Sequence, residues 1–157
     1  MPTFTTQFIK HMVEESIPLH RFLGLELLEI RPDYAKVRVP FREEVIGDIR
    51  QLRWHGGIIA AIMESVGGIA GFTRLGSMED KMATIDMRVD FLRGAVELPI
   101  EIEAEVLRCG NRILVTTMRA WQEGNAKPLA EGRAVYSIRR KEEEQAPGTD
   151  VDSNGFA

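Results

Sequence analysis

The most informative stretch of the chain is residues 54–72, which read WHGGIIAAIMESVGGIAGF. Large apolar side chains recur here at helical spacing, and their density predicts a helix over residues 56–74 that is largely enclosed by a sheet. Gly56 and Gly57 open this helix, and a single carboxylate, Glu64, lies in its middle. The role of that acid is the first question that the sequence raises.

Segments of alternating polar and apolar residues surround the helix. A short amphipathic helix is expected over residues 5–16, where Pro18 ends it, and residues 42–53 are expected to form a polar loop. Short turns join the later strands, which favours antiparallel pairing. The sequence therefore predicts an α+β fold in which a six-stranded antiparallel sheet wraps around one long central helix. The expected strands cover residues 25–31, 34–40, 84–91, 100–106, 111–121 and 128–139.

Length and composition favour a single domain. The chain has 157 residues, of which 44% are hydrophobic and 28% are charged, as is usual for a soluble globular protein. We expect one domain over residues 1–140. Residues 141–157 lack apolar periodicity and are rich in acids, so they are expected to form a disordered acidic tail.

The charge of the expected domain is balanced. The chain holds 20 basic and 24 acidic residues. The tail contains one of the basic residues and five of the acidic ones, so the expected domain has 19 of each. A neutral domain gives no support for nucleic-acid binding. Cys109 is the only cysteine, which excludes an intrachain disulfide, and Glu64 interrupts the longest apolar segment. We expect a cytoplasmic protein that does not bind a membrane.

Glu64 lies among the smallest residues of the central helix. At 3.6 residues per turn it shares one stripe with Ala60 and with the glycines at positions 57, 67, 68 and 71. An interior glycine costs about 0.5–1 kcal/mol relative to alanine, so a helix, a strand or a ligand is expected to approach this stripe closely. Glu64 is then either a structural ion-pair partner at an interface or part of a reactive site.

The start of the helix offers a complementary feature. With no side chains at Gly56 and Gly57, the free N–H groups and the positive end of the helix dipole favour negative charge. At a rise of about 1.5 Å per residue, Glu64 lies roughly 10 Å along the axis from Gly57, too far for both to contact one atom. A second subunit would supply the acid at the required distance.

At these positions the sequence resembles the hotdog-fold acyl-CoA thioesterases, in particular the branch similar to the phenylacetic acid degradation thioesterases. The shared pattern is His-Gly-Gly at residues 55–57 with an acid nine residues after the histidine, at Glu64. Residues 83–93 (ATIDMRVDFLR) resemble the family's third strand, and residues 130–136 (AEGRAVY) resemble its last. The resemblance covers about residues 20–140. It implies a homodimer whose third strands pair, with two active sites at the interface, and often a dimer of dimers.

Carried over position by position, the resemblance implies hydrolysis of an acyl or aryl thioester to the carboxylic acid and free coenzyme A, without a cofactor. Gly57 would donate its N–H to the thioester carbonyl, Gly56 would contact the substrate, and His55 would shape the loop before the helix. Glu64 of the opposite subunit would activate water or attack directly. A thioester suits so small a set of groups because a thiolate leaves without a strong general acid.

Two further residues are candidate substrate contacts. Asp48 matches, with an offset of one residue, an Asn of many relatives, although a loop-capping role is the favoured interpretation. Thr84 either borders the site from the partner chain or is an ordinary surface threonine. The related 4-hydroxybenzoyl-CoA enzymes that use Glu place a Thr one turn after it, where this chain has Gly68.

Coenzyme A carries phosphates, and a neutral domain must bind them with local positive charge. Arg53, Arg88 and Arg93 are the candidates, and each could equally be a solvated surface arginine. No metal site is expected, because the three histidines show no ligand spacing. Candidates for the floor of an acyl pocket, or for plain core, are Met63, Phe72, Met82 and Phe91.

Two other functions fit the same fold. A non-catalytic module that binds or senses acyl-CoA is the main alternative, and it would have no need for an acid beside the thioester. A dehydratase or hydratase acting on acyl thioesters is the third possibility. Those enzymes pair a catalytic histidine with an acid at a different separation from the one between His55 and Glu64, so this function ranks last.

Overall fold

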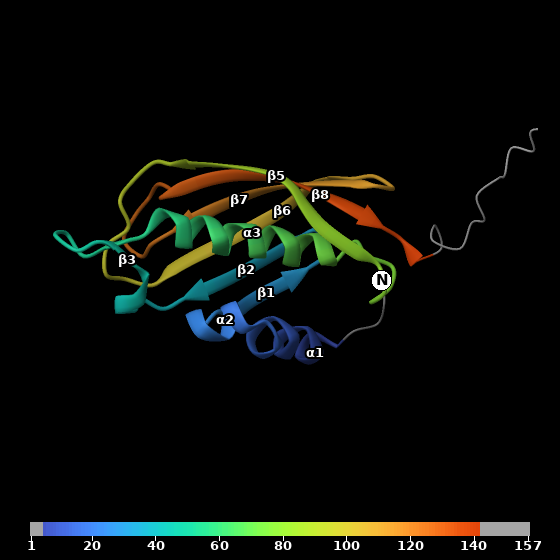
Figure 1. Cartoon of the computed structure of the whole chain (residues 1–157), viewed down its shortest axis with the longest axis horizontal. Helices are drawn as coiled ribbons and strands as arrows, with labels where there is room; N and C mark the ends of the chain where they lie inside the picture. The colour runs from blue at the N-terminus through green and yellow to red at the C-terminus, as the bar shows by residue number, and fades with distance from the viewer. Residues whose placement is uncertain (1–4, 142–157) are drawn as a thin grey trace, which may run out of the picture.

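The computed structural model describes residues 5–141, and the tail that the sequence predicts to be disordered lies outside this range apart from Lys141. The sheet and its central helix occupy most of the described chain (Figure 1). The elements in chain order are α1 (Thr6–His11), a π-helical turn η1 (Met12–Ser16), α2 (Pro18–Leu23), β1 (Glu26–Arg31), β2 (Tyr34–Val39), a 3₁₀ turn η2 (Glu43–Val45), β3 (Ile46–Asp48), β4 (Arg53–Trp54), α3 (Gly56–Phe72), β5 (Lys81–Phe91), β6 (Ile100–Cys109), β7 (Ile113–Trp121) and β8 (Ala130–Arg139).

Six strands form one sheet in the order β1-β2-β6-β7-β8-β5, and every neighbouring pair is antiparallel. The predicted six-stranded antiparallel sheet with one central helix is therefore confirmed. α3 packs along one face of the sheet, mainly against β2, β6 and β7 (Figure 1). After α3 the chain continues to the edge of the sheet opposite β1, where it forms β5.

The core lies between α3 and the sheet. The alternation that predicts strand β2 places Ala35, Val37 and Val39 inward, and all three are fully buried. α3 contributes Ile62 and Met63, which are also buried. Burying one such side chain contributes about 1.5–3 kcal/mol, so this layer is the main source of stability for α3.

Strand β5 departs from simple alternation. Its register against β8 shifts between Thr84 and Asp86, which leaves Ile85 in a bulge. Before the bulge Thr84 lies opposite the buried Tyr136, and after it Asp86 lies opposite Val135. Regular alternation would place Thr84 and Asp86 on the same face. The bulge instead directs Thr84 toward α3 and Asp86 away from it.

The N-terminal segment differs from the single helix predicted over residues 5–16. α1 ends at His11, and a π-helical turn follows. Pro18 then begins a second helix, α2, because proline at the first helical position has its φ already set and needs no N–H partner. Gly24 ends α2 with a φ of 67°, a left-handed conformation that suits a residue without Cβ.

The stretch predicted as a polar loop over residues 42–53 also contains regular structure. It holds the 3₁₀ turn η2 and the short antiparallel ribbon of β3 and β4. Val45 and Trp54 anchor this ribbon because both are buried. Two- and three-residue strands carry too little pattern to be recognised from sequence.

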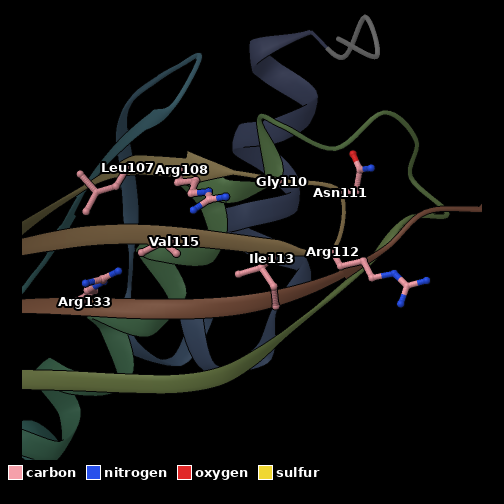
Figure 2. A pocket seen from close by; sticks show the side chains of 8 residues that line it. All are labelled: Leu107, Arg108, Gly110, Asn111, Arg112, Ile113, Val115 and Arg133. Atoms are coloured by element: carbon pink, nitrogen blue, oxygen red, sulfur yellow. The ribbon is translucent and has the colours of Figure 1, made fainter.

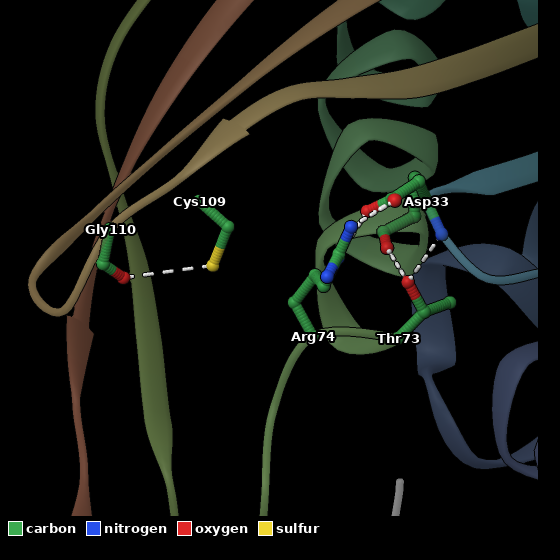
Figure 3. Close-up of polar contacts among 6 residues, drawn as sticks. Asp33, Thr73, Arg74, Cys109 and Gly110 are labelled. Carbon is green, nitrogen blue, oxygen red and sulfur yellow. Dashed lines mark hydrogen bonds and ion pairs between the residues drawn. The ribbon is translucent and has the colours of Figure 1, made fainter.

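The end of α3 is fastened to the turn between β1 and β2. The Thr73 hydroxyl accepts the Asp33 N–H at 3.0 Å and donates to the Ala70 carbonyl at 2.7 Å (Figure 3). Arg74 forms an ion pair with the Asp33 carboxylate, and that contact raises the pKa of Arg74. Cys109 lies across the same region and contacts only the Gly110 carbonyl among the residues drawn. These contacts fix the direction of α3 across the sheet.

Candidate active site

His55 forms the N-terminal cap of α3. Its own N–H donates to the Val45 carbonyl at 2.7 Å, which fixes the loop before the helix. Its ring Nδ1 accepts the Gly57 N–H at 2.9 Å. An imidazole nitrogen can accept only without a proton, so the neutral ring carries its proton on Nε2 in this arrangement. His55 therefore occupies the N–H that the resemblance assigns to the thioester carbonyl.

The neighbouring Gly56 N–H has no hydrogen-bond partner within residues 5–141. Gly56 is half-buried, and the Phe91 ring lies over it. A Cβ added at Gly56 would lie 3.2 Å from the Phe91 ring, so glycine is the residue that fits. Gly57 itself is exposed, and a Cβ there would lie 2.9 Å from the His55 ring. The start of α3 thus combines the Gly56 N–H, unpaired within residues 5–141, with a Gly57 N–H that is capped by His55.

Glu64 is half-buried on α3, and its carboxylate accepts a hydrogen bond from the Thr84 hydroxyl of the same chain. From the sequence, Thr84 is expected either to border the site from the partner chain or to be an ordinary surface threonine. The bulge at Ile85 explains the difference, because it directs Thr84 toward α3. Position 68, one turn after Glu64, holds a glycine instead of the threonine of the 4-hydroxybenzoyl-CoA enzymes. In this chain Thr84 supplies a hydroxyl to the acid.

Tyr136 is a further residue at this acid, and the sequence analysis did not identify it. Its hydroxyl donates to the Glu64 backbone carbonyl at 2.8 Å from β8. Burial raises the pKa of Tyr136, and the negative charge of Glu64 acts in the same direction, so the phenol remains a donor. No local sequence signal marks this residue, because the contact depends on where β8 lies in the sheet.

The glycines of α3 have different neighbours. At Gly67 the side chains of Tyr136, Thr116 and Met118 approach the backbone so closely that a Cβ would clash. Gly68 is different, because a Cβ there would meet only Met82 at 3.8 Å and Tyr136 at 4.0 Å. The sheet therefore explains Gly67, whereas Gly68 has room for a Cβ at ordinary contact distance.

The remaining candidate residues lie in several places. Asp48 caps the turn between β3 and β4, where its Oδ1 accepts the Arg50 N–H at 2.9 Å. Arg88 pairs with Asp90 at 3.0 Å on the outer face. Arg93 donates to the Pro128 carbonyl at 2.8 Å.

Two cavities can be compared with the acyl pocket that the sequence predicts. One holds about 370 Å³ beside Gly68 and includes Phe72 and Met82 among its lining residues. Met63 is fully buried in the core instead, and the exposed Phe91 covers Gly56.

The second cavity, of about 450 Å³, lies at the hairpin of β6 and β7 (Figure 2). Arg108, Arg112 and Arg133 surround it. Arg133 precedes Ala134, which is buried against α3, so Arg133 points to the opposite face of the sheet. This cavity is therefore separate from Glu64.

Residues 5–141 contain no group of three His, Cys, Asp or Glu side chains that could hold a metal ion. Within the same range, no helix is both long and apolar enough to cross a membrane.

A sequence model of the thioesterase superfamily matches residues 53–129, which include the start of α3, Glu64 and Thr84. This match assigns residues 53–129 to the thioesterase superfamily. It is 27% identical to the medium/long-chain acyl-CoA thioesterase YigI of Escherichia coli over 143 residues, which is 83% of this chain and 88% of the relative. It is also 28% identical to a putative esterase of Saccharolobus solfataricus, over 84% of this chain and 91% of that protein.

Solved structures agree with this assignment. A thioesterase-superfamily protein of Shewanella oneidensis has a TM-score of 0.73 and 28% identity, covering 85% of this chain and 94% of that one. The phenylacetic acid degradation protein PaaI of Thermus thermophilus has a TM-score of 0.68 and 24% identity, covering 77% of this chain and 98% of its own, and shows the shared fold alone. The expected hotdog fold and thioester hydrolase class are confirmed, while membership of the narrower branch stays a prediction.

Proposed function

We propose that this thioesterase hydrolyses acyl-CoA thioesters in a homodimer, with the carbonyl bound at the start of α3 of one chain and Glu64 supplied by its partner. The observation that carries the proposal is the environment of Glu64. Its carboxylate is half-buried and held by Thr84, and its backbone is held by Tyr136. A residue whose carboxylate is held from β5 and whose backbone is held from β8 has the fixed position that a base or nucleophile requires.

The reaction follows from these groups. Glu64 takes a proton from water as the water oxygen attacks the carbonyl carbon, or its own oxygen attacks that carbon and water later cleaves the anhydride. Either way the carbonyl oxygen becomes an oxyanion, which the N–H groups at the start of α3 stabilise. The tetrahedral intermediate then collapses, and the carbon–sulfur bond breaks to release the CoA thiolate.

The bond between His55 and Gly57 has a role in this scheme. A carbonyl oxygen that approaches Gly57 competes with Nδ1 of His55 for the same N–H. Gly56 offers a second N–H that has no partner within residues 5–141. His55 therefore keeps the Gly57 N–H oriented before substrate binds, and rotation of the ring releases it.

The edge strand β5 supports the dimer. It spans Lys81–Phe91, pairs with β8 on one side and with no other strand of residues 5–141, and exposes Ile85 and Phe91. A long edge with exposed apolar side chains is a ready surface for another strand. Pairing of two β5 strands would also bring the start of α3, beside Phe91, toward the partner chain.

Non-catalytic binding of acyl-CoA is the second candidate function. The observation that favours it is the His55 bond to Gly57, which occupies the main expected donor. Against it stands Glu64, because a half-buried acid beside a thioester costs binding energy and contributes nothing to a pure binder.

The test is release of free thiol from short, medium, long and aryl acyl-CoAs by the wild type and by Glu64→Gln. We expect activity on at least one thioester and a loss of about 100-fold or more in the variant, the usual scale for a general base. Inert proteins that still bind acyl-CoA would establish the binding function instead. A fully active Glu64→Gln variant would contradict the assignment of the acid.

A further inference from the structure

The cavity of about 370 Å³ lies between the N-terminal segment, α3 and the start of β5. This volume is within the range of small-molecule binding sites, roughly 300–1,000 Å³. Its walls come from parts of the chain that are far apart in sequence. The lining residues are Ile9, Met12, Val13, Ile17, His20, Ser65, Gly68, Ile69, Phe72, Leu75, Asp80 and Met82.

The cavity is chemically apolar. Most of its lining side chains are aliphatic, aromatic or thioether groups. His20 is buried and its Nδ1 bonds to the Val13 carbonyl at 2.8 Å. The Asp80 carboxylate accepts the N–H groups of Gly76 at 2.8 Å and Ser77 at 3.2 Å. These polar groups are engaged in the fold, so an alkyl group is the ligand chemistry that the cavity favours.

The cavity begins beside the acid. Ser65 follows Glu64 directly, and Gly68 lies one helical turn after it on the same side of α3. Met82 lies on β5 two residues before Thr84, on the face that Thr84 shares because the bulge comes after both. A Cβ added at Gly68 would meet Met82 and Tyr136 only at 3.8 and 4.0 Å, so a group bound at the Glu64 carboxylate has an uncrowded path past Gly68 into the cavity.

We propose that this cavity binds the alkyl chain of the acyl group whose thioester is attacked by Glu64 of the same chain. This proposal rests on the proposed function and names its substrate class as unbranched aliphatic acyl thioesters of medium length. If each non-hydrogen atom takes about 30 Å³, as a water molecule does, the cavity holds on the order of ten carbons. The N-terminal segment, through Ile9, Met12 and Ile17, forms the wall that limits chain length.

The first test fills the cavity from α3. Gly68→Leu has room for its Cβ, and the rest of the side chain extends into the cavity. Each buried methylene contributes about 0.8 kcal/mol, so excluding several of them should lower kcat/KM for decanoyl-CoA by about 100-fold. Activity on acetyl-CoA or butyryl-CoA, whose chains stop before the cavity, should stay within about 3-fold of wild type by the same reasoning.

A second variant protects the test against misfolding. Ile17 is the N-cap of α2 without a side-chain cap bond, and it is 39% exposed. Ile17→Asp places a preferred capping residue there, so the fold tolerates it, yet it adds a charge to the cavity wall. It should reduce activity on decanoyl-CoA and leave butyryl-CoA unchanged. The matched control is Ile113→Asp, which changes an isoleucine of similar exposure, 42%, at the separate β6–β7 hairpin cavity rather than at the cavity beside Gly68.

A binding measurement separates this proposal from the proposed function. Decanoate should raise the Tm of wild type and of Glu64→Gln, because the cavity is intact in both, and it should not raise that of Gly68→Leu. If the wild type hydrolyses acyl-CoAs and both Gly68→Leu and Ile17→Asp keep its chain-length profile, the cavity assignment is wrong. The proposed function would still stand. A wild type that binds decanoate and hydrolyses no thioester would contradict the proposed function and leave the cavity assignment supported.

Discussion

Thr84 donates a hydrogen bond to the Glu64 carboxylate across the gap between β5 and α3, although the two residues lie 20 positions apart. The bond orients the acid within the site. We expect Thr84→Val, which keeps the shape without the hydroxyl, to lower kcat by about 10-fold, as loss of one hydrogen bond to a charged group predicts. Steady-state kinetics on an active acyl-CoA measures this effect.

Thr84→Ser is the matched control, because it retains the hydroxyl and removes only a methyl group. Its kcat should stay close to that of wild type. If valine and serine reduce kcat equally, packing rather than the hydroxyl is what Thr84 contributes, and its assigned positioning role is wrong.

The sequence predicted the helix and the sheet but not this hydrogen bond, for a physical reason. The pattern of α3 and of strands β2 and β6 comes from periodic burial, which is visible in a single sequence. A bulge breaks that period without a local signal, and regular alternation would place Thr84 on the same face as Asp86. The order of the strands in the sheet is also not visible in a single sequence. The bond from Tyr136 to the Glu64 carbonyl, which joins residues 72 positions apart, depends on that order.

The residues at the N-terminus of α3, in contrast, could be predicted from the sequence. His55, Gly56 and Gly57 are adjacent in sequence, so their place at the start of the helix could be predicted, and the structure places them together at the N-terminus of α3. What could not be predicted is that the His55 ring binds the Gly57 N–H, because that depends on a side-chain rotamer. The α2 helix was missed since Pro18 serves equally well to stop one helix or to start the next.

Two adjacent glycines of α3 should respond in opposite ways to alanine. At Gly67 a Cβ would lie 2.9 Å from the Thr116 hydroxyl and closer still to that of Tyr136, so Gly67→Ala should destabilise by about 1–3 kcal/mol. At Gly68 the nearest atom is 3.8 Å away, so Gly68→Ala should gain about 0.5–1 kcal/mol of helix propensity. Urea unfolding of both variants tests this. Equal shifts would contradict the crowding assigned to Gly67.

Asp80 should make stability depend on pH. Burial opposes its ionisation, but hydrogen bonds from the Gly76, Lys141 and Ser77 N–H groups, together with Arg140, outweigh burial and hold the pKa of Asp80 below its usual value. A carboxyl whose pKa is lowered by folding stabilises the protein above its unfolded pKa, about 3.9, and that contribution is lost as the pH falls through the folded pKa.

Asp80→Asn should therefore lower the urea midpoint near neutral pH, and the difference from wild type should shrink as the pH falls below about 4. Asp90→Asn is the control, since Asp90 is about half exposed and paired only with Arg88. A difference between Asp80→Asn and wild type that is constant from neutral to acidic pH would show that the amide perturbs packing rather than charge.

Arg53 is the most available of the predicted phosphate ligands. Its guanidinium lies over Gly94 near the start of α3, and it forms no ion pair within residues 5–141. Arg53→Ala should lower kcat/KM on acyl-CoA by about 10-fold, the scale of one hydrogen bond to a charged group, and have little effect on acyl-pantetheine, which lacks the nucleotide phosphates. Arg133→Ala, on the opposite face, is the control and should act like wild type on both thioesters.

The sharing of each site between two chains is tested by mixing inactive variants. Glu64→Gln removes the acid, and Gly57→Pro removes the N–H at an early helical position where proline is tolerated. In a mixed dimer with shared sites, one site carries both defects and the other carries none. Refolding the two inactive proteins together should then restore up to about a quarter of wild-type activity, since half of the dimers are mixed and each has one intact site. If each chain instead builds a site from its own Gly57 and Glu64, every site in the mixture keeps one defect, and no activity returns.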